Sequence, residues 1–198
     1  YLASKFPGFS TENMENKEIM EENNDKVGVI FFFYLIEKFI PPQKGRKHIL
    51  LIIREIINFI PDNKATDVDC ALRFLNDAIK KRCAAFLISD FINGGDYQKS
   101  MSIANKKHDL TAIQVYDKRD SKMPDVGLIR VKDSETDLDC WIDTSSKRLR
   151  QIYDKAWYDQ QQKLNMTVAR CGVDIASIAT DEDYVKSLLG LFKKRSLH

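Results

Sequence analysis

Ser89 and Asp90, whose side chains carry oxygen atoms, directly follow the apolar run Phe86 to Ile88. The stretch is FLISDFINGG, so two further apolar residues and then Gly94 and Gly95 come next. Short polar side chains at a strand end can cap the following turn, because they hydrogen-bond to nearby backbone N–H groups. They can also face a crevice, because open parallel sheets bind ligands outside the carboxyl ends of their strands. The sequence leaves both interpretations open.

A hydroxyl and two carboxylates precede this stretch, in Ala65-Thr66-Asp67-Val68-Asp69. Thr66 is predicted to be the N-cap of a helix, with Asp69 three residues later in a capping-box relation. Mg²⁺ prefers hard oxygen ligands and keeps several of its waters, so a few hydroxyls and one carboxylate can hold it. Thr66 and Asp90 are therefore candidate metal ligands, and capping without a metal is the alternative.

Nothing in the sequence has the spacing of a common catalytic motif. The GxSxG, HExxH, GxGxxG and Walker A patterns are all missing. His108 and Asp109 come before a predicted strand, at its amino end, whereas sites gather at carboxyl ends. We therefore expect a structural histidine, and a protein that is not an enzyme.

Composition fits one soluble globular domain. The 198 residues are 43% hydrophobic and 30% charged, and a net charge of +2 gives no indication of nucleic-acid binding. The four cysteines form no CxxC pair, which favours reduced thiols in a cytoplasmic protein over a disulfide framework or a zinc site. The longest apolar runs have strand length, so no membrane span is expected.

Apolar spacing predicts strands and helices that alternate along most of the chain. Strands are expected at 27–34, 35–40, 83–89, 110–116, 127–131, 138–142 and 173–178. Helices are expected at 11–24, where the apolar face is weak, and at 46–60, 66–82, 97–107, 145–170 and 181–195. The run at 27–34 suggests a strand covered on both faces, and Pro41-Pro42 should end the next strand. This alternation indicates an α/β fold with a parallel sheet and crossover helices.

Several stretches together resemble a bacterial family of unknown function that has a von Willebrand factor A-like domain and is often found beside MoxR-type AAA+ ATPases. These stretches are NNDKVGVIFF (23–32), IEKFIPPQKGRKHIL (36–50), ATDVDCALRFL (65–75), FLISDF (86–91), KKHDLTAIQVYDKRDSKMPDVGLIRVKDSET (106–136) and WIDTSSKRLRQIYD (141–154). The resemblance begins at about Asn23. It implies a von Willebrand factor A-like fold, with a mostly parallel central sheet flanked by helices on both faces.

In this resemblance Thr66 and Asp90 match the threonine and the aspartate of a metal-ion-dependent adhesion site. The DxSxS motif and the apolar first strand that such a site also needs have no counterpart in residues 1–24, where only Ser4 matches a motif serine. The first strand is therefore expected to be degenerate. Residues 1–24 form a degenerate amino-terminal segment in this interpretation, and residues 25–198 form the von Willebrand factor A-like domain.

The resemblance implies a non-enzymatic protein-binding adaptor with an incomplete adhesion site. Its partner would be a protein, with a MoxR-type AAA+ ATPase as the candidate. Thr66 and Asp90 would be the metal positions, with Ser89, Gly94 and Gly95 in the partner-binding surface, and Mg²⁺ binding is expected to be weak or absent. One alternative is a degenerate structural or regulatory domain without metal, recognised through the loop at 133–139. Another is a metal-dependent hydrolase that uses Asp90 with Asp67 or Asp69.

Overall fold

The computed structural model describes residues 25–60, 66–92, 95–132 and 139–195. The predicted helix at 11–24 and the degenerate segment 1–24 lie outside the described residues, as do Ser4, Gly94 and most of the loop at 133–139. The elements, in chain order, are β1 (Val27–Phe32), β2 (Ile36–Gln43), α3 (Arg46–Asn58), α4 (Val68–Ala78), β3 (Ala84–Ser89), α5 (Gln98–Lys107), β4 (Asp109–Tyr116), α6 (Lys118–Ser121), β5 (Leu128–Lys132), β6 (Asp139–Asp143), α7 (Lys147–Arg170), β7 (Asp174–Ala179) and α8 (Tyr184–Arg195).

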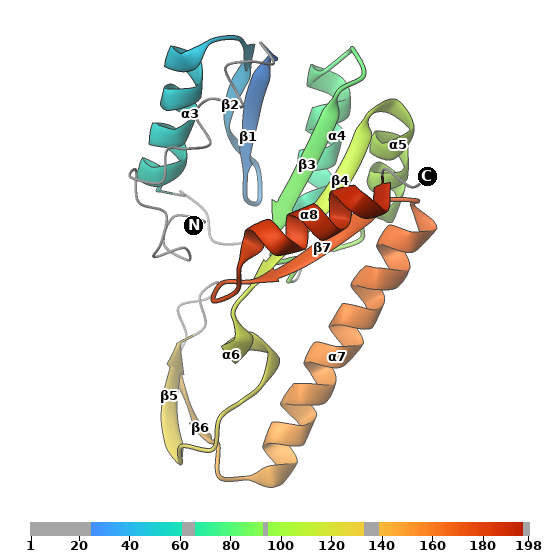
Figure 1. Cartoon of the computed structure of the whole chain (residues 1–198). Helices are drawn as coiled ribbons and strands as arrows, with labels where there is room; N and C mark the ends of the chain where they lie inside the picture. The colour runs from blue at the N-terminus through green and yellow to red at the C-terminus, as the bar shows by residue number, and fades with distance from the viewer. Residues whose placement is uncertain (1–24, 61–65, 93–94, 133–138, 196–198) are drawn as a thin grey trace.

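A parallel sheet with strand order β3-β4-β7 forms the centre of the described fold (Figure 1). Ala84 of β3 pairs with Asp109 of β4, and Thr111 of β4 pairs with Asp174 of β7. Helices connect these strands, as parallel pairing requires. The prediction of a mixed α/β fold with a parallel sheet flanked by helices is confirmed.

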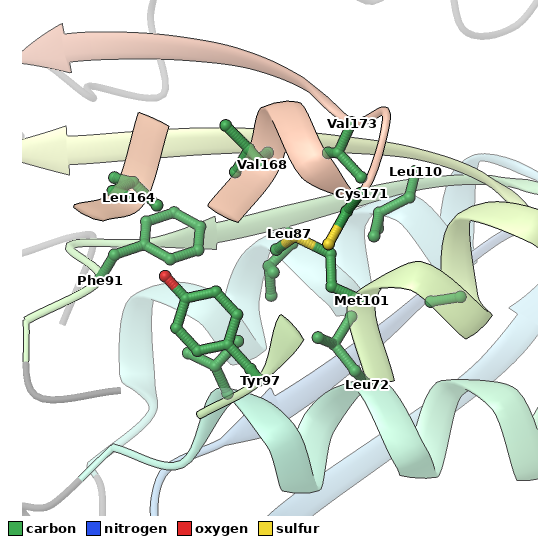
Figure 2. Close-up of a cluster of buried hydrophobic side chains, with 13 residues drawn as sticks. Leu72, Leu87, Phe91, Tyr97, Met101, Leu110, Leu164, Val168, Cys171 and Val173 are labelled. Carbon is green, nitrogen blue, oxygen red and sulfur yellow. The ribbon is translucent and has the colours of Figure 1, made fainter. Parts of the chain in front are cut away.

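Each face of this sheet packs against different helices. On one face, the strands contact α4, α5 and the last turns of α7 in a cluster that Figure 2 shows. Its members include Leu72, Leu87, Met101, Leu110, Leu164 and Val168. On the other face, Ile113, Val115 and Ile178 pack against Leu188 of α8. Full burial of such side chains stabilises the fold by about 1.5–3 kcal/mol each. The middle strand β4 is covered on both sides, and this fixes the position of its carboxyl end.

The first two strands differ from the prediction. β1 is half-buried and not covered on both faces, and it pairs antiparallel with β2 in a sheet of its own. The reason is the tight turn between them, where the N–H of Phe33 donates to the carbonyl of Leu35 at 3.0 Å, since so short a connection allows only antiparallel pairing. β2 also continues through Pro41 and Pro42, which an edge strand tolerates.

The predicted strand pair at 127–142 is a hairpin of β5 and β6. Buried Thr144 closes its open end, because its hydroxyl donates to the carbonyl of Gly127 at 2.6 Å and accepts from the N–H of Val126 at 3.0 Å. The helix that follows, α7, returns the chain to the parallel sheet. In the described ranges, no helix is both long enough and apolar enough to cross a membrane.

Candidate functional site

The carboxyl ends of β3, β4 and β7 carry a row of polar side chains across the parallel sheet. Ser89, Gln114 and Ser177 occupy matching positions, since Ser89 pairs with Gln114 and Gln114 pairs with Ser177. Residues at matching positions of parallel strands point to the same face. The row therefore puts three hydrogen-bonding side chains on one face, at the edge where parallel sheets bind ligands.

Gln114 is the centre of this row and is 1% exposed. The hydroxyl of Ser177 donates to Gln114 Oε1 at 2.9 Å, and Gln114 Nε2 donates to the main-chain carbonyl of Asp90 at 3.3 Å. A buried amide needs such partners, because leaving it without them costs about 1–3 kcal/mol. The side chain of Gln114 thus ties the loop after β3 to the middle of the sheet.

Ser89 and Asp90 cap the turn that follows β3. Ser89 Oγ accepts from the N–H of Phe91, and Asp90 Oδ1 accepts from the N–H of Ile92, both at 3.1 Å. The turn also holds Phe91 at a φ of 57°, in the left-handed region that aromatic residues avoid. The capping interpretation of the strand end is therefore realised in the structure.

Packing and hydrogen bonds hold this strained turn in place. Phe91 is buried beside Tyr97, with ring centroids 6.1 Å apart (Figure 2). Its main-chain carbonyl accepts from Gln160 Nε2 of α7 at 3.2 Å. A left-handed non-glycine residue costs about 1–2 kcal/mol, so the surrounding contacts must offset that cost. The Asp90 carboxylate is consequently presented on a loop anchored by both β4 and α7.

The start of α4 differs from the predicted capping. Asp67, and not Thr66, is the N-cap, because Asp67 Oδ1 accepts from the N–H of Cys70 at 3.0 Å. Asp69 does not close a capping box. Its carboxylate accepts from the hydroxyl of Ser100 and pairs with Arg73 at 2.8 Å. The N-cap therefore lies one residue later than predicted, at Asp67.

The predicted site residues are only partly brought together. Ser89 and Asp90 are adjacent at the end of β3, and half-buried Thr66 precedes α4, which starts at the same edge of the sheet because it returns to β3 through the short connection 79–83. Gly95 is exposed and has a φ of 68°, which suits glycine. Gly94 is not among the described residues.

These donors do not fit a complete divalent-cation site. The carboxylates of Asp67 and Asp69 serve α4 and α5, and one oxygen of Asp90 serves its own turn. Within the described ranges, no group of three or more His, Cys, Asp or Glu side chains could hold a metal ion. A Mg²⁺ ion at Thr66 and Asp90 would thus depend on waters and on ligands from elsewhere.

His108 lies at the amino ends of the parallel strands, opposite to the candidate site, as its position before β4 predicts. It is fully buried at the end of α5, with Nδ1 3.5 Å from Cys83 Sγ. Burial, followed by the nearby positive charge of Lys107, lowers the pKa of its imidazole. The sheet separates this histidine from Asp90, so the two do not form one site.

The sequence interpretation missed Gln114, Ser177 and Gln160. Gln114 could have been recognised as the polar residue in the middle of the buried run LTAIQVY, because buried polar side chains in strands have hydrogen-bonding partners. Ser177 and Gln160 had no local signal of this kind. They are found only when β7 and α7 are placed beside β4.

Comparison with known proteins gives a family and relatives without an assigned role. Residues 18–163 match the family described as "Protein of unknown function DUF58". An uncharacterized protein of Mycobacterium avium is 27% identical over 158 residues, covering 79% of this chain and 93% of that protein. An uncharacterized protein of Mycobacterium tuberculosis is 26% identical over 160 residues, and there the chain spans about half of the relative's length (50%).

The structure is also similar to the crystal structure of the conserved hypothetical protein BatB from Bacteroides thetaiotaomicron. The TM-score is 0.46 and the sequence identity 14%, over 93% of this chain and 89% of that chain. The family match is the stronger result, because it covers most of the sequence. On that basis, the chain belongs to the DUF58 family of proteins of unknown function.

Proposed function

We propose that this protein is a non-enzymatic protein-binding adaptor whose contact surface is the carboxyl edge of β3, formed by Thr66, Ser89, Asp90 and Gly95. One observation carries the proposal: side chains of β4 and α7 hold the main chain of the Asp90 loop from two sides. Among the described residues, none donates to the second carboxylate oxygen, Oδ2 of Asp90. That oxygen is thus available to a partner.

A carboxylate fixed in this way suits a basic side chain of a protein partner. Charge-assisted hydrogen bonds are about twice as strong as neutral ones. A loop that is already ordered also loses less conformational entropy on binding. The resemblance to von Willebrand factor A-like domains supports a protein as the partner, and a MoxR-type AAA+ ATPase is the candidate. Mg²⁺ would contribute weakly or not at all.

The direct test is binding of a purified MoxR-type ATPase from the same organism, measured by biolayer interferometry. Asp90→Asn should weaken binding about tenfold or more, because asparagine can keep the turn but carries no charge. Asp143→Asn is the matched control, since Asp143 Oδ1 accepts from the N–H of Ser145 at 3.0 Å in a similar turn far along the chain. Equal affinity of wild type and Asp90→Asn would move the contact to another surface.

Calorimetric titration of Mg²⁺ and Mn²⁺ tests whether the Asp90 carboxylate contacts its partner directly or through a metal ion. We expect weak binding or no heat in both the wild type and Asp90→Ala. If a metal ion binds saturably to one site of the wild type and this binding is lost in Asp90→Ala, the contact with the partner would be bridged by the metal and not direct. Phosphoester turnover that disappears in Asp90→Ala would contradict the non-enzymatic assignment.

A further inference from the structure

β7 is the outermost strand of the parallel sheet and has one free edge. It pairs with β4 on one side, and no strand among the described residues pairs with its other side. The N–H of Thr180, which directly follows β7, donates to the carbonyl of Tyr116 in β4 at 2.9 Å. Successive residues of a strand point their main-chain groups alternately to the two sides. Thr180 and every second residue before it therefore face β4, so the N–H and C=O groups of Ile175, Ser177 and Ala179 point to the free edge.

This edge lacks the features by which natural sheets prevent further pairing. Residues 175–179 read IASIA, with neither a charged residue nor a proline, and their pairing with β4 has a regular register. By contrast, β2, which is an edge strand of the other sheet, carries Glu37, Lys38, Pro41 and Pro42. Charges, prolines and bulges protect edge strands, and an unprotected edge is a template for pairing with another chain. The free edge of β7 is thus open to a further strand.

A hollow lies beside this edge, between β7 and α8, the helix that packs over β7 in Figure 1. It is lined by residues 175–177 of β7 and by one face of α8, which includes Ser187, Gly190 and Lys194. A Cβ added to Gly190 would have no atom within 4 Å. The side of α8 next to the free edge therefore leaves room for another chain beside β7.

The two ends of β7 carry opposite charges. Arg195 pairs with Asp174 at 3.2 Å, so the last turn of α8, with exposed Lys194, lies at the amino end of β7. Exposed Asp183 lies between the carboxyl end of β7 and the start of α8. Neither Lys194 nor Asp183 has an ion-pair partner among the described residues. A strand antiparallel to β7 would therefore suit this edge if its own amino end were basic and its own carboxyl end acidic, which is the pattern of β7 itself.

We propose that two copies of this chain pair through β7, antiparallel to each other and related by a two-fold axis at Ser177. The two sheets would then join into one with the order β3, β4, β7, β7, β4, β3. A two-fold interface needs a surface that is complementary to itself. The outward-pointing residues meet this condition, because Ser177 faces its counterpart in the second copy and Ile175 faces Ala179. Each of these pairs exchanges two main-chain hydrogen bonds.

Other occupants fit this edge less well. A strand of a different protein would need the charge pattern that the second copy already has. A small ligand in the hollow would leave most of the outward-pointing groups of β7 without a partner. The interface is also separate from the Asp90 contact proposed above, because β4 lies between β3 and β7.

Sedimentation velocity over a range of concentrations tests the proposal with the whole chain. We expect a reversible equilibrium between monomer and dimer. Gly190→Lys should raise the dissociation constant about tenfold or more, because it puts a charged side chain into the hollow beside the edge. Val185→Lys is the matched control, since Val185 is an exposed residue (45%) on the opposite side of α8, and it should change the constant by less than about twofold. Circular dichroism establishes that both variants fold.

An exchange of charges tests the antiparallel arrangement. In this arrangement Lys194 of each copy lies at the end of the interface where the other copy has Asp183. Lys194→Glu and Asp183→Lys should each weaken their own dimer, because each brings like charges together. A mixture of the two variants should associate about threefold or more tightly than either variant alone, because both contacts then join opposite charges. Asp183 also accepts from the N–H of Val185 at 3.0 Å, so the folding of Asp183→Lys is checked in the same way.

Amide hydrogen exchange tests the location. Exchange at Ile175 and Ser177 should be slower in the dimer than in the monomer, whereas Ala176 and Ile178 face β4 and should be protected in both. Several outcomes would overturn the proposal: a protein that is monomeric at every concentration, a dimer that Gly190→Lys leaves intact, a mixture of charge variants that associates no better than each alone, or slower exchange only on another surface. Asp90→Asn should dimerise as the wild type does, which separates this proposal from the proposed function.

Discussion

The side chain of Gln114 holds the main chain of Asp90, with Nε2 of Gln114 and the carbonyl oxygen of Asp90 3.3 Å apart. In the parallel sheet Gln114 pairs with Ser89 of β3, so the Gln114 side chain reaches one residue beyond its paired residue. The side-chain oxygen of Gln114, Oε1, accepts a hydrogen bond from the hydroxyl of Ser177 in β7. A single buried amide therefore links the outer strand β7, through β4, to the loop that carries the candidate carboxylate.

Replacing this amide by an apolar side chain of similar size should destabilise the protein. In Gln114→Leu the carbonyl of Asp90 and the hydroxyl of Ser177 lose their partner, and an unsatisfied buried polar group costs about 1–3 kcal/mol. Urea unfolding measures the change. Gln162→Leu, at an exposed position of α7, is the control and should change stability by less than about 0.5 kcal/mol. If Gln114→Leu lowered the free energy of unfolding by as little as the control does, the hydrogen bonds of Gln114 would not hold the loop.

Sequence reasoning located the strand end at Ser89 and Asp90, but not the side chains that hold it. The change from Phe86–Ile88 to Ser89-Asp90 has a local cause, the end of an apolar run, and it was recognised. Spacing predicted Thr66 as the N-cap of α4, but the cap is its neighbour Asp67, whose Oδ1 accepts from the N–H of Cys70. Spacing alone does not choose between two adjacent capping residues. Gln114 and Ser177 meet because β4 and β7 are neighbours, and that is a property of topology.

The β1–β2 hairpin should not tolerate a side chain at Gly28. A Cβ there would lie 2.8 Å from the carbonyl oxygen of Ile40 and 2.9 Å from the nitrogen of Pro42, both of them main-chain atoms. Overpacking of this kind costs about 1–3 kcal/mol, so Gly28→Ala should lower the urea midpoint.

Gly190→Ala is the opposite case. Nothing lies within 4 Å of its added Cβ, and alanine in a helix is about 0.5–1 kcal/mol more favourable than glycine. This variant of α8 should unfold at a higher urea concentration than wild type. Equal effects of the two substitutions would contradict the close approach of β1 and β2.

The same hairpin shows where sequence reasoning about the fold ends. Apolar periodicity predicted the helix at 46–60, and α3 runs from Arg46 to Asn58. It also identified the apolar run of β1. The partner of that strand is set by the short turn at Phe33 and by the arrangement of α4, and neither is encoded in the period of the run. For the same reason, Pro41 and Pro42 did not end β2, because they lie on an edge strand.

The thiols should differ in their reactivity. Cys140 is exposed on β6, whereas burial raises the pKa of the Cys83 thiol and so reduces its thiolate fraction. In native protein, Ellman's reagent should modify Cys140 at least about tenfold faster than Cys83. Cys140→Ser should remove the fastest phase, and Cys83→Ser should leave it unchanged. A fast phase that disappears in Cys83→Ser would show that Cys83 is open to solvent.

The buried histidine should make stability depend on pH. His108 is fully buried, and its Nε2 has no hydrogen-bond partner among the described residues. Its pKa in the native state is lowered, first by burial and then by Lys107, so below the unfolded value of about 6.5 the unfolded chain binds more protons than the folded one. Stability is thus fully present above about pH 6.5 and is lost as the pH falls through the window below that value.

Urea unfolding between about pH 7.5 and pH 5.5 tests this sign. The unfolding free energy of wild type should fall with decreasing pH, and His108→Gln should show a shallower fall, whatever its stability at neutral pH. Lys107→Met should also flatten the dependence, because it removes the second cause of the lowered pKa. Parallel pH profiles for wild type and His108→Gln would mean that water or a mobile neighbour solvates the charged imidazole in the folded chain, so that burial does not exclude its proton.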